Sequence, residues 1–179
     1  MSRFIALLTV LMLALAAPAF AHGPSRLKVV EKVEIAKSPD EVWAMIKNFD
    51  GIAKWLPGAV SSPADKGNEI GSTRIITLKS GGKITEQLER YDDAGRSYFY
   101  RITDVDVKVL PVNNYSSTLE VKPGADGKSA VVEWRGAFYR GYPNNDPPPE
   151  LNDDAAEKAV TGVYRSGLDH LKEMAEKGK

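Results

Sequence analysis

The chain has 179 residues, and its 24 lysines and arginines balance 24 aspartates and glutamates. A formal net charge of zero gives no bulk electrostatic attraction to nucleic acid or to an anionic membrane. The chain contains no cysteine, which excludes disulfides, thiolate nucleophiles and thiolate metal ligands. We therefore expect stability to come from packing, and any charge-based recognition to come from local groups.

The first 21 residues have the pattern of a secretory signal peptide. One basic residue, Arg3, precedes an apolar run over about 4–17, and Ala19-Phe20-Ala21 fits the small-x-small pattern of a cleavage site. The run is shorter than the ~20 residues that a transmembrane anchor needs. We therefore expect cleavage after Ala21, a periplasmic protein, and a single mature domain over 22–179.

The mature chain begins with a strand pattern and a capped helix. Residues 27–36 alternate between apolar and charged side chains, which predicts a half-buried strand. Ser38 precedes Pro39, and Glu41 follows three residues after Ser38, which completes a capping box for a helix. Asp50-Gly51 ends that helix, and a second short helical turn follows before Pro57.

Antiparallel strands are predicted for most of the next eighty residues. Turn signals separate alternating segments, and Gly81-Gly82 indicates a two-residue hairpin turn. From Asp153 to about Lys177 the apolar residues recur at helical spacing, which predicts a long amphipathic closing helix. The strands do not alternate with crossover helices, so the fold class is α+β. The simplest burial curls the sheet around the closing helix, with the two short helices at one end.

The order of elements and several segments resemble a known superfamily. The segments are "SPDEVWAMIKNFDGIAKWLPG", "GGKITEQLERYD", "LPVNNYSSTLEV" and "VYRSGLDHLKEMAE". Together they resemble the SRPBCC superfamily in its polyketide-cyclase/START-like (Bet v 1-like) branch. This resemblance implies a helix-grip fold with a hydrophobic cavity. With the signal peptide included, the chain is similar to the periplasmic MxaD proteins of methylotrophic bacteria, which implies a role in assisting methanol dehydrogenase and its cytochrome c electron acceptor.

One predicted strand places two charged residues on its inner face. Counting by two along "KITEQLERYD" puts Glu86 and Arg90 on the face of Ile84 and Leu88. Charges facing a cavity are costly unless they meet each other, a ligand or water, so both are candidates for polar ligand contacts. The alternative is a structural pair near the cavity mouth.

Aromatic residues supply the remaining cavity candidates. Trp43 belongs to the helix core, whereas Trp55 is placed at the cavity entrance, where it could act as a gate. Each of the others could line the pocket or belong to the ordinary core. These candidates are Tyr98, Tyr100, Tyr115, Trp134, Phe138 and Tyr164.

The sequence offers no catalytic set, and we expect no metal and no cofactor. The mature chain has two histidines, His22 and His170, which support neither a Ser-His-Asp triad nor a multi-histidine metal site. The loop over 142–154 is the most conspicuous exposed feature. Its carboxylates could cap the closing helix or steer a basic partner. They are Asp146, Glu150, Asp153 and Asp154.

Three classes of function remain. A non-catalytic periplasmic accessory protein accounts for export, the acidic loop and the missing catalytic set, and it comes first. A carrier or binder of a small hydrophobic ligand is the alternative, because the predicted interior is curved and aromatic. A cyclase- or hydrolase-like enzyme comes third, since it would depend on Glu86 or a tyrosine as acid or base.

Overall fold

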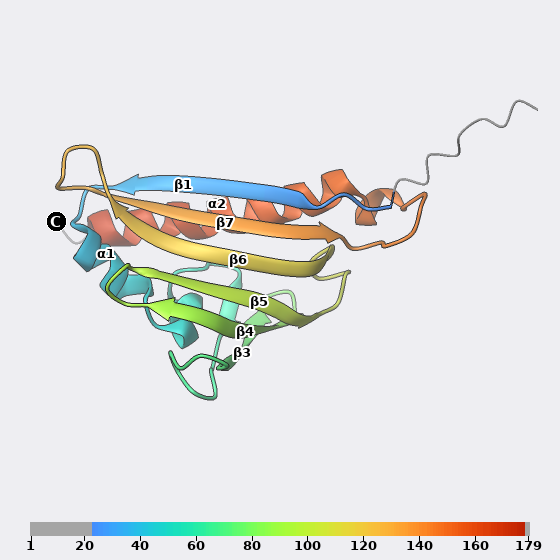
Figure 1. The fold of residues 1–179 in the computed structure, drawn as a ribbon, viewed down its shortest axis with the longest axis horizontal. Helices are drawn as coiled ribbons and strands as arrows, with labels where there is room; N and C mark the ends of the chain where they lie inside the picture. Colours follow the sequence, from blue (N-terminus) through green and yellow to red (C-terminus); the bar gives the residue numbers. More distant parts are fainter. Residues whose placement is uncertain (1–22, 178–179) are drawn as a thin grey trace, which may run out of the picture.

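The computed structural model describes residues 23–177, so the predicted signal peptide lies outside the described residues (Figure 1). The helices are α1 (Pro39–Ile46), the 3-10 helices η1 (Phe49–Lys54) and η2 (Pro149–Leu151), and α2 (Asp153–Lys177). The strands are β1 (Leu27–Ile35), β2 (Ala59–Ser61), β3 (Thr73–Leu78), β4 (Lys83–Asp92), β5 (Ser97–Val105), β6 (Val112–Pro123) and β7 (Ala130–Arg140).

One curved, antiparallel sheet contains all seven strands in the order β1-β7-β6-β5-β4-β3-β2. Helix α2 runs along one side of this sheet and contacts β1 and β7, while α1 and η1 lie toward one end (Figure 1). The α+β helix-grip fold is therefore confirmed. Among residues 23–177, no helix is both long and apolar enough to cross a membrane.

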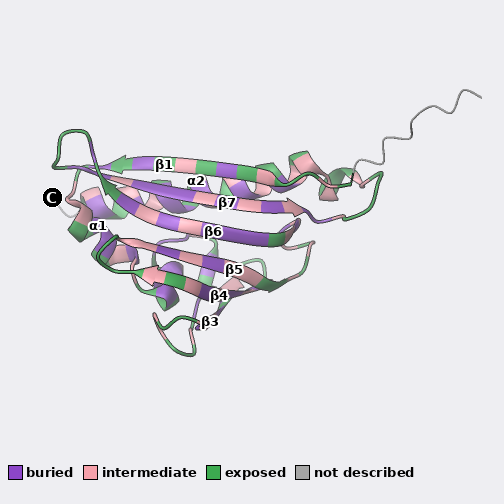
Figure 2. Ribbon diagram, viewed as in Figure 1, coloured by how far each residue is buried: buried purple, intermediate pink, exposed green. Residues whose placement is uncertain are grey.

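The core lies on the concave side of the sheet, as the alternation of buried and exposed residues indicates. Figure 2 shows buried and more exposed residues alternating along the strands, as expected when one face packs inward. The buried side of α2 has the predicted helical spacing. Its buried residues are Ala156, Val160, Tyr164, Gly167, Leu168, Leu171 and Ala175.

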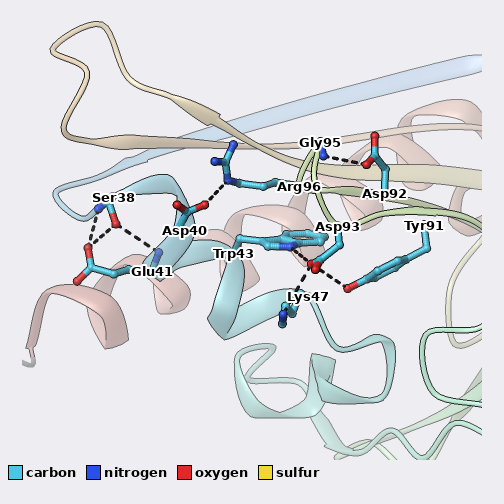
Figure 3. A network of polar contacts seen from close by, with 10 residues as sticks. All are labelled: Ser38, Asp40, Glu41, Trp43, Lys47, Tyr91, Asp92, Asp93, Gly95 and Arg96. Atoms are coloured by element: carbon cyan, nitrogen blue, oxygen red, sulfur yellow. Dashed lines mark hydrogen bonds and ion pairs between the residues drawn. The ribbon is translucent and has the colours of Figure 1, made fainter.

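The predicted capping box at the start of α1 is present. The Ser38 hydroxyl accepts a hydrogen bond from the Glu41 amide at 3.3 Å, and the Glu41 carboxylate accepts one from the Ser38 amide at 2.9 Å (Figure 3). Hydrogen bonds from Ser38 lower the pKa of Glu41. The cap fixes the start of a helix that buries Val42, Trp43 and Ile46.

The turn between β3 and β4 is longer than predicted. Strand β3 ends at Leu78 and β4 begins at Lys83, so residues 79–82 form a four-residue turn and the two-residue prediction is wrong. The Leu78 amide donates to the Gly82 carbonyl at 2.9 Å, and Gly81 has a φ of 91°. Glycine suits that left-handed backbone because it has no Cβ. The turn takes in Lys79 and Ser80 as well as the two glycines, so β3 ends two residues before the predicted turn, whereas β4 begins directly after it.

Trp43 joins α1 to the turn between β4 and β5. Its indole Nε1 donates to Asp93 Oδ1 at 2.7 Å, and the Tyr91 hydroxyl donates to the same oxygen at 3.4 Å (Figure 3). The ammonium of Lys47 lies 3.7 Å from it. Trp43 is buried, so its predicted place in the core is confirmed. Its indole N–H nevertheless takes part in the polar contacts around Asp93 at the surface.

The Trp43 hydrogen bond, supported by Lys47, lowers the pKa of Asp93 below its ordinary value of 3.8. A lowered pKa means that this carboxylate stabilises the fold above pH 3.8, and that its contribution is lost as the pH falls below that value. We expect Asp93→Asn to lower the free energy of unfolding near neutral pH. The difference from the wild type should vanish in acid, as measured by urea unfolding.

Asp104→Asn is the control, because Asp104 lies at an exposed position of β5. This change should leave stability nearly unaltered at both pH values. A deficit of Asp93→Asn that persists unchanged in acid would contradict the assigned role of the carboxylate.

Candidate functional site

A cavity of about 270 Å³ lies within the grip of the sheet and helices. Its wall is mainly apolar and comes from η1, β3 to β7, α2 and the connecting loops. Exposed residues Lys79 and Ser80 belong to this wall, so the cavity reaches the surface beside the turn between β3 and β4. The lining consists of Ile52, Leu56, Gly58, Ile76, Leu78, Lys79, Ser80, Ile84, Glu86, Tyr100, Ile102, Val109, Leu110, Tyr115, Trp134, Val163 and Ser166.

Glu86 is the one carboxylate in this lining, and it is paired with a buried arginine. Arg74 Nε donates to Glu86 Oε2 at 2.5 Å, and the two residues are directly opposite each other on β3 and β4. The side chains of Arg74 and Glu86 are 0% and 5% exposed. Such a pair is costly to desolvate, and removing either partner would leave a buried charge.

Arg74 is held in place by more than its carboxylate partner. Its Nη1 donates to the Phe49 carbonyl of η1 at 2.7 Å. Its guanidinium carbon lies 4.1 Å from the Phe49 ring centre and 4.9 Å from that of Tyr100, within cation–π range. Burial raises the pKa of Glu86, and the permanently charged Arg74 opposes that rise. The pair therefore forms a fixed, overall neutral unit beside the cavity.

Tyrosine hydroxyls form a second group of hydrogen-bonded polar atoms in the interior. Trp134 Nε1 donates to the Tyr100 hydroxyl at 3.0 Å. The hydroxyls of Tyr115 and Tyr164 are hydrogen-bonded to each other, and that of Tyr164 also meets Ser117 Oγ at 2.9 Å. Burial raises the pKa of all three tyrosines, so they present neutral hydroxyls.

Stacked rings link α2 to the sheet behind the cavity. The Trp134 and Tyr164 rings stack with centroids 4.3 Å apart, and Trp55 meets Trp134 edge-on at 5.3 Å. Two glycines permit this approach. A Cβ at Gly136 would lie 2.2 Å from the Tyr164 hydroxyl, and one at Gly167 would lie 3.1 Å from the Trp55 ring.

The structure divides the predicted cavity residues into three groups. Glu86, Tyr100, Tyr115 and Trp134 line the cavity as predicted. A second group is buried without being part of that lining, and it comprises Trp55, Tyr98, Phe138 and Tyr164. Arg90 belongs to neither group, because it is exposed.

The placement of Arg90 on the inner face is therefore wrong. A register irregularity between Leu88 and Arg90 interrupts the pairing of β4 with β5, and such a bulge reverses the alternation of side chains. The Arg90 guanidinium instead lies 4.3 Å from the ring centre of Phe99. Glu86 consequently pairs with Arg74 and not with Arg90.

Sequence reasoning missed Arg74 although a signal was present. Arg74 lies two residues before Ile76 in a segment predicted as a strand, so both side chains share the buried face. Counting by two along that strand would have found an inward arginine opposite Glu86.

Placing Trp55 at the cavity entrance is also wrong. The side chain is 1% exposed and packs between Trp134 and α2. The backbone carbonyl of Trp55 contacts His170 Nδ1 at 3.0 Å, and His170 is partly buried. Both contacts make Trp55 part of the packing between η1 and α2.

Part of the acidic loop over 142–154 is held by contacts with Arg140. Asp146, Glu150 and Asp154 are exposed, whereas Asp153 lies 3.3 Å from Arg140. Arg140 also donates to the carbonyls of residues 142 and 144, which holds the loop. The helix cap comes from Asn152, whose Oδ1 accepts from the amide of residue 155 at 2.8 Å. Within residues 23–177, no cluster of three or more His, Cys, Asp or Glu side chains could hold a metal ion.

Comparison with known proteins assigns the family. Residues 26–176 match the family described as polyketide cyclase / dehydrase and lipid transport, and the chain belongs to this family. The XoxI structure from Bacillus cereus is 31% identical, with a TM-score of 0.72, and the match covers 85% of this chain and 98% of that one. An uncharacterised protein from Bacillus thuringiensis is 32% identical, with a TM-score of 0.70 and coverage of 83% and 98%.

A curated plant protein is similar over part of the chain. The abscisic acid receptor PYL7 of Arabidopsis thaliana is 33% identical over 95 residues. The match covers 51% of this chain and 44% of the receptor, so it spans less than half of that relative.

Because Trp55 is fully packed, we expect Trp55→Ala to lower the free energy of unfolding by about 3–5 kcal/mol. Trp55→Phe keeps a ring against Trp134 and should cost clearly less. Denaturant unfolding of the two variants measures the difference. A near-zero loss for the alanine variant would show that the side chain is not packed as described.

Proposed function

We propose that the chain binds a small, largely apolar molecule in the cavity and acts as its carrier or binder. The observation that carries this proposal is a cavity of about 270 Å³ with an apolar wall and one buried carboxylate in it. Protein interiors hold few voids larger than a water molecule, so a space of this size is unusual for a core. It lies just below the ~300–1,000 Å³ range of ligand pockets, which favours a ligand smaller than a typical drug.

The relatives support the same class of function. The family description names lipid transport, and the partial relative PYL7 is a receptor for abscisic acid. Binding without catalysis is the simpler proposal for this chain. Arg74 already holds one Glu86 oxygen, and the raised pKa of Tyr100 and Tyr115 keeps both hydroxyls protonated, so neither is available as a base.

Filling part of the cavity should weaken binding without unfolding the protein. Val163 lines the cavity from α2, so Val163→Phe would occupy part of the space. We expect the variant to lose at least tenfold in affinity for small apolar compounds, equivalent to about 1.4 kcal/mol. The thermal midpoint should be retained. Calorimetric titration with cyclohexane-based compounds and thermal unfolding measure the two effects.

Val30→Phe is the matched control, because Val30 is 52% exposed on β1. It should bind like the wild type. Unchanged binding by a folded Val163→Phe protein would place the ligand elsewhere and overturn the proposal.

We propose as a second candidate a periplasmic accessory role of MxaD type, assisting methanol dehydrogenase and its cytochrome c. The export pattern of residues 1–21 and the three exposed carboxylates of a loop held by Arg140 favour it. A fixed acidic loop suits recognition of a basic partner through steering and on-rate. This role is compatible with an occupied cavity, because the loop and the cavity share no residue.

Neutralising the exposed carboxylates should weaken such a complex. The tagged protein is expressed in the organism that it comes from. We expect it to retain methanol dehydrogenase or cytochrome c in a pull-down from periplasmic extract. Retention should fall with added salt. It should also fall severalfold in the triple variant Asp146→Asn, Glu150→Gln, Asp154→Asn.

The control neutralises three exposed acids elsewhere, Asp104→Asn, Asp106→Asn and Glu157→Gln. It preserves the change in net charge and should leave retention unaltered. Absence of both named proteins from the wild-type pull-down would reject the accessory role and leave the carrier proposal standing.

A further inference from the structure

We propose that the polar end of the cavity selects a neutral alcohol or phenol. Glu86 accepts a hydrogen bond from the ligand's hydroxyl group, and Tyr100 donates one to the ligand's oxygen. This inference rests on the proposed binding function and adds the chemical class of the ligand. Both residues line the cavity, and both come from adjacent strands. Leu88 is opposite Tyr100 and Glu86 is opposite Ile102, so Glu86 and Tyr100 are diagonal neighbours on one face. Diagonal neighbours are within reach of long side chains.

Glu86 supplies the acceptor. Its Oε2 accepts from Arg74, while no hydrogen bond joins its Oε1 to any residue of the described chain. An ionised carboxylate can only accept hydrogen bonds. Glu86 belongs to the cavity lining and its Oε1 is not among the fully buried unpaired atoms, so it can accept a hydrogen bond from a ligand O–H. Arg74 acts as a positioning residue, because its bond to Oε2 and its contact with the Phe49 carbonyl fix the carboxylate.

Tyr100 supplies the donor. Its oxygen receives the Trp134 indole proton, so its own proton has to point elsewhere. Ser117 is close enough to lower the pKa of Tyr100, but its Oγ already bonds the Arg135 carbonyl and the Tyr164 hydroxyl, and no hydrogen bond joins it to Tyr100 in residues 23–177. The raised pKa of Tyr100 keeps the proton on the oxygen. One acceptor and one donor on neighbouring positions complement a hydroxyl group, which both donates and accepts.

The charge of the site excludes ionised ligands. Arg74 already neutralises Glu86, so the pair presents no net charge to the cavity. A ligand carboxylate would meet the free oxygen of Glu86 and would lose its hydration, while Arg74, including its unpaired Nη2, lies outside the cavity lining. A ligand ammonium would gain Glu86 but would lie near the fixed guanidinium of Arg74. Burying an uncompensated charge costs several kcal/mol, so a neutral hydroxyl is preferred to either.

The test uses four compounds that share one cyclohexyl body: cyclohexylmethanol, cyclohexylmethylamine, cyclohexanecarboxylate and ethylcyclohexane. None absorbs where tryptophan is excited, and Trp134 lines the cavity, so quenching or enhancement of tryptophan fluorescence reports binding. We expect the alcohol to bind about tenfold more tightly than ethylcyclohexane, as two net hydrogen bonds would give. It should exceed the amine and the carboxylate by more.

Tyr100→Phe should reduce the preference for the alcohol over ethylcyclohexane severalfold, because it removes the donor to the alcohol oxygen. Tyr139→Phe is the control, because Tyr139 lies on β7 outside the cavity lining, and it should keep the full preference. Neither variant removes Arg74 or Glu86.

The outcomes separate the two proposals. Equal binding of the alcohol and ethylcyclohexane, or tighter binding of the amine or the carboxylate, would overturn the assigned ligand class and leave the carrier function standing. An alcohol preference that survives Tyr100→Phe would remove Tyr100 from the site. Failure of all four compounds to bind would overturn the carrier function together with this inference.

Discussion

A single helix has to cover a sheet that is much wider than the helix. Seven strands at ~4.8 Å spacing span roughly 30 Å, whereas a helix with its side chains is about 10–12 Å across. Helix α2 therefore contacts β1 and β7 and leaves the concave face of the middle strands to other groups. Curvature of the sheet and η1 reduce the uncovered area, and the rings of Trp134 and Tyr164 fill the space next to α2. The cavity is what remains of this mismatch.

The buried ion pair holds the wall that α2 does not reach. Arg74 on β3 binds Glu86 on β4 and the Phe49 carbonyl of η1, so one guanidinium joins two strands and the short helix. Its position between the Phe49 and Tyr100 rings also gives the charge favourable aromatic contacts. The pair is thus both a structural brace and the source of polarity in an apolar cavity. This double role explains why a carboxylate can lie in the wall without unfolding it.

Local signals predicted much of the fold, because they depend on contacts between neighbours in sequence. Ser38 and Glu41 form the predicted capping box, and the alternation on β4 correctly turned Glu86 inward. The same counting failed at Arg90, since it assumes an unbroken period of two and a bulge intervenes after Leu88. Trp55 was misplaced for a different reason. Trp55 follows η1, a six-residue 3-10 helix that is too short for a periodic pattern, so nothing local indicates which way its side chain points.

The sequence by itself determined the order of elements, the inward faces of the strands and the aromatic character of the interior, because periodicity and turn chemistry act over a few residues. Only the tertiary structure decided that Glu86 pairs with Arg74 and that Tyr100 lines the cavity while its oxygen accepts from Trp134. Those outcomes depend on strand register, a bulge and the distance between α2 and the middle of the sheet. Each arises from groups far apart in the chain, and the volume left between them is fixed only when all of them pack together.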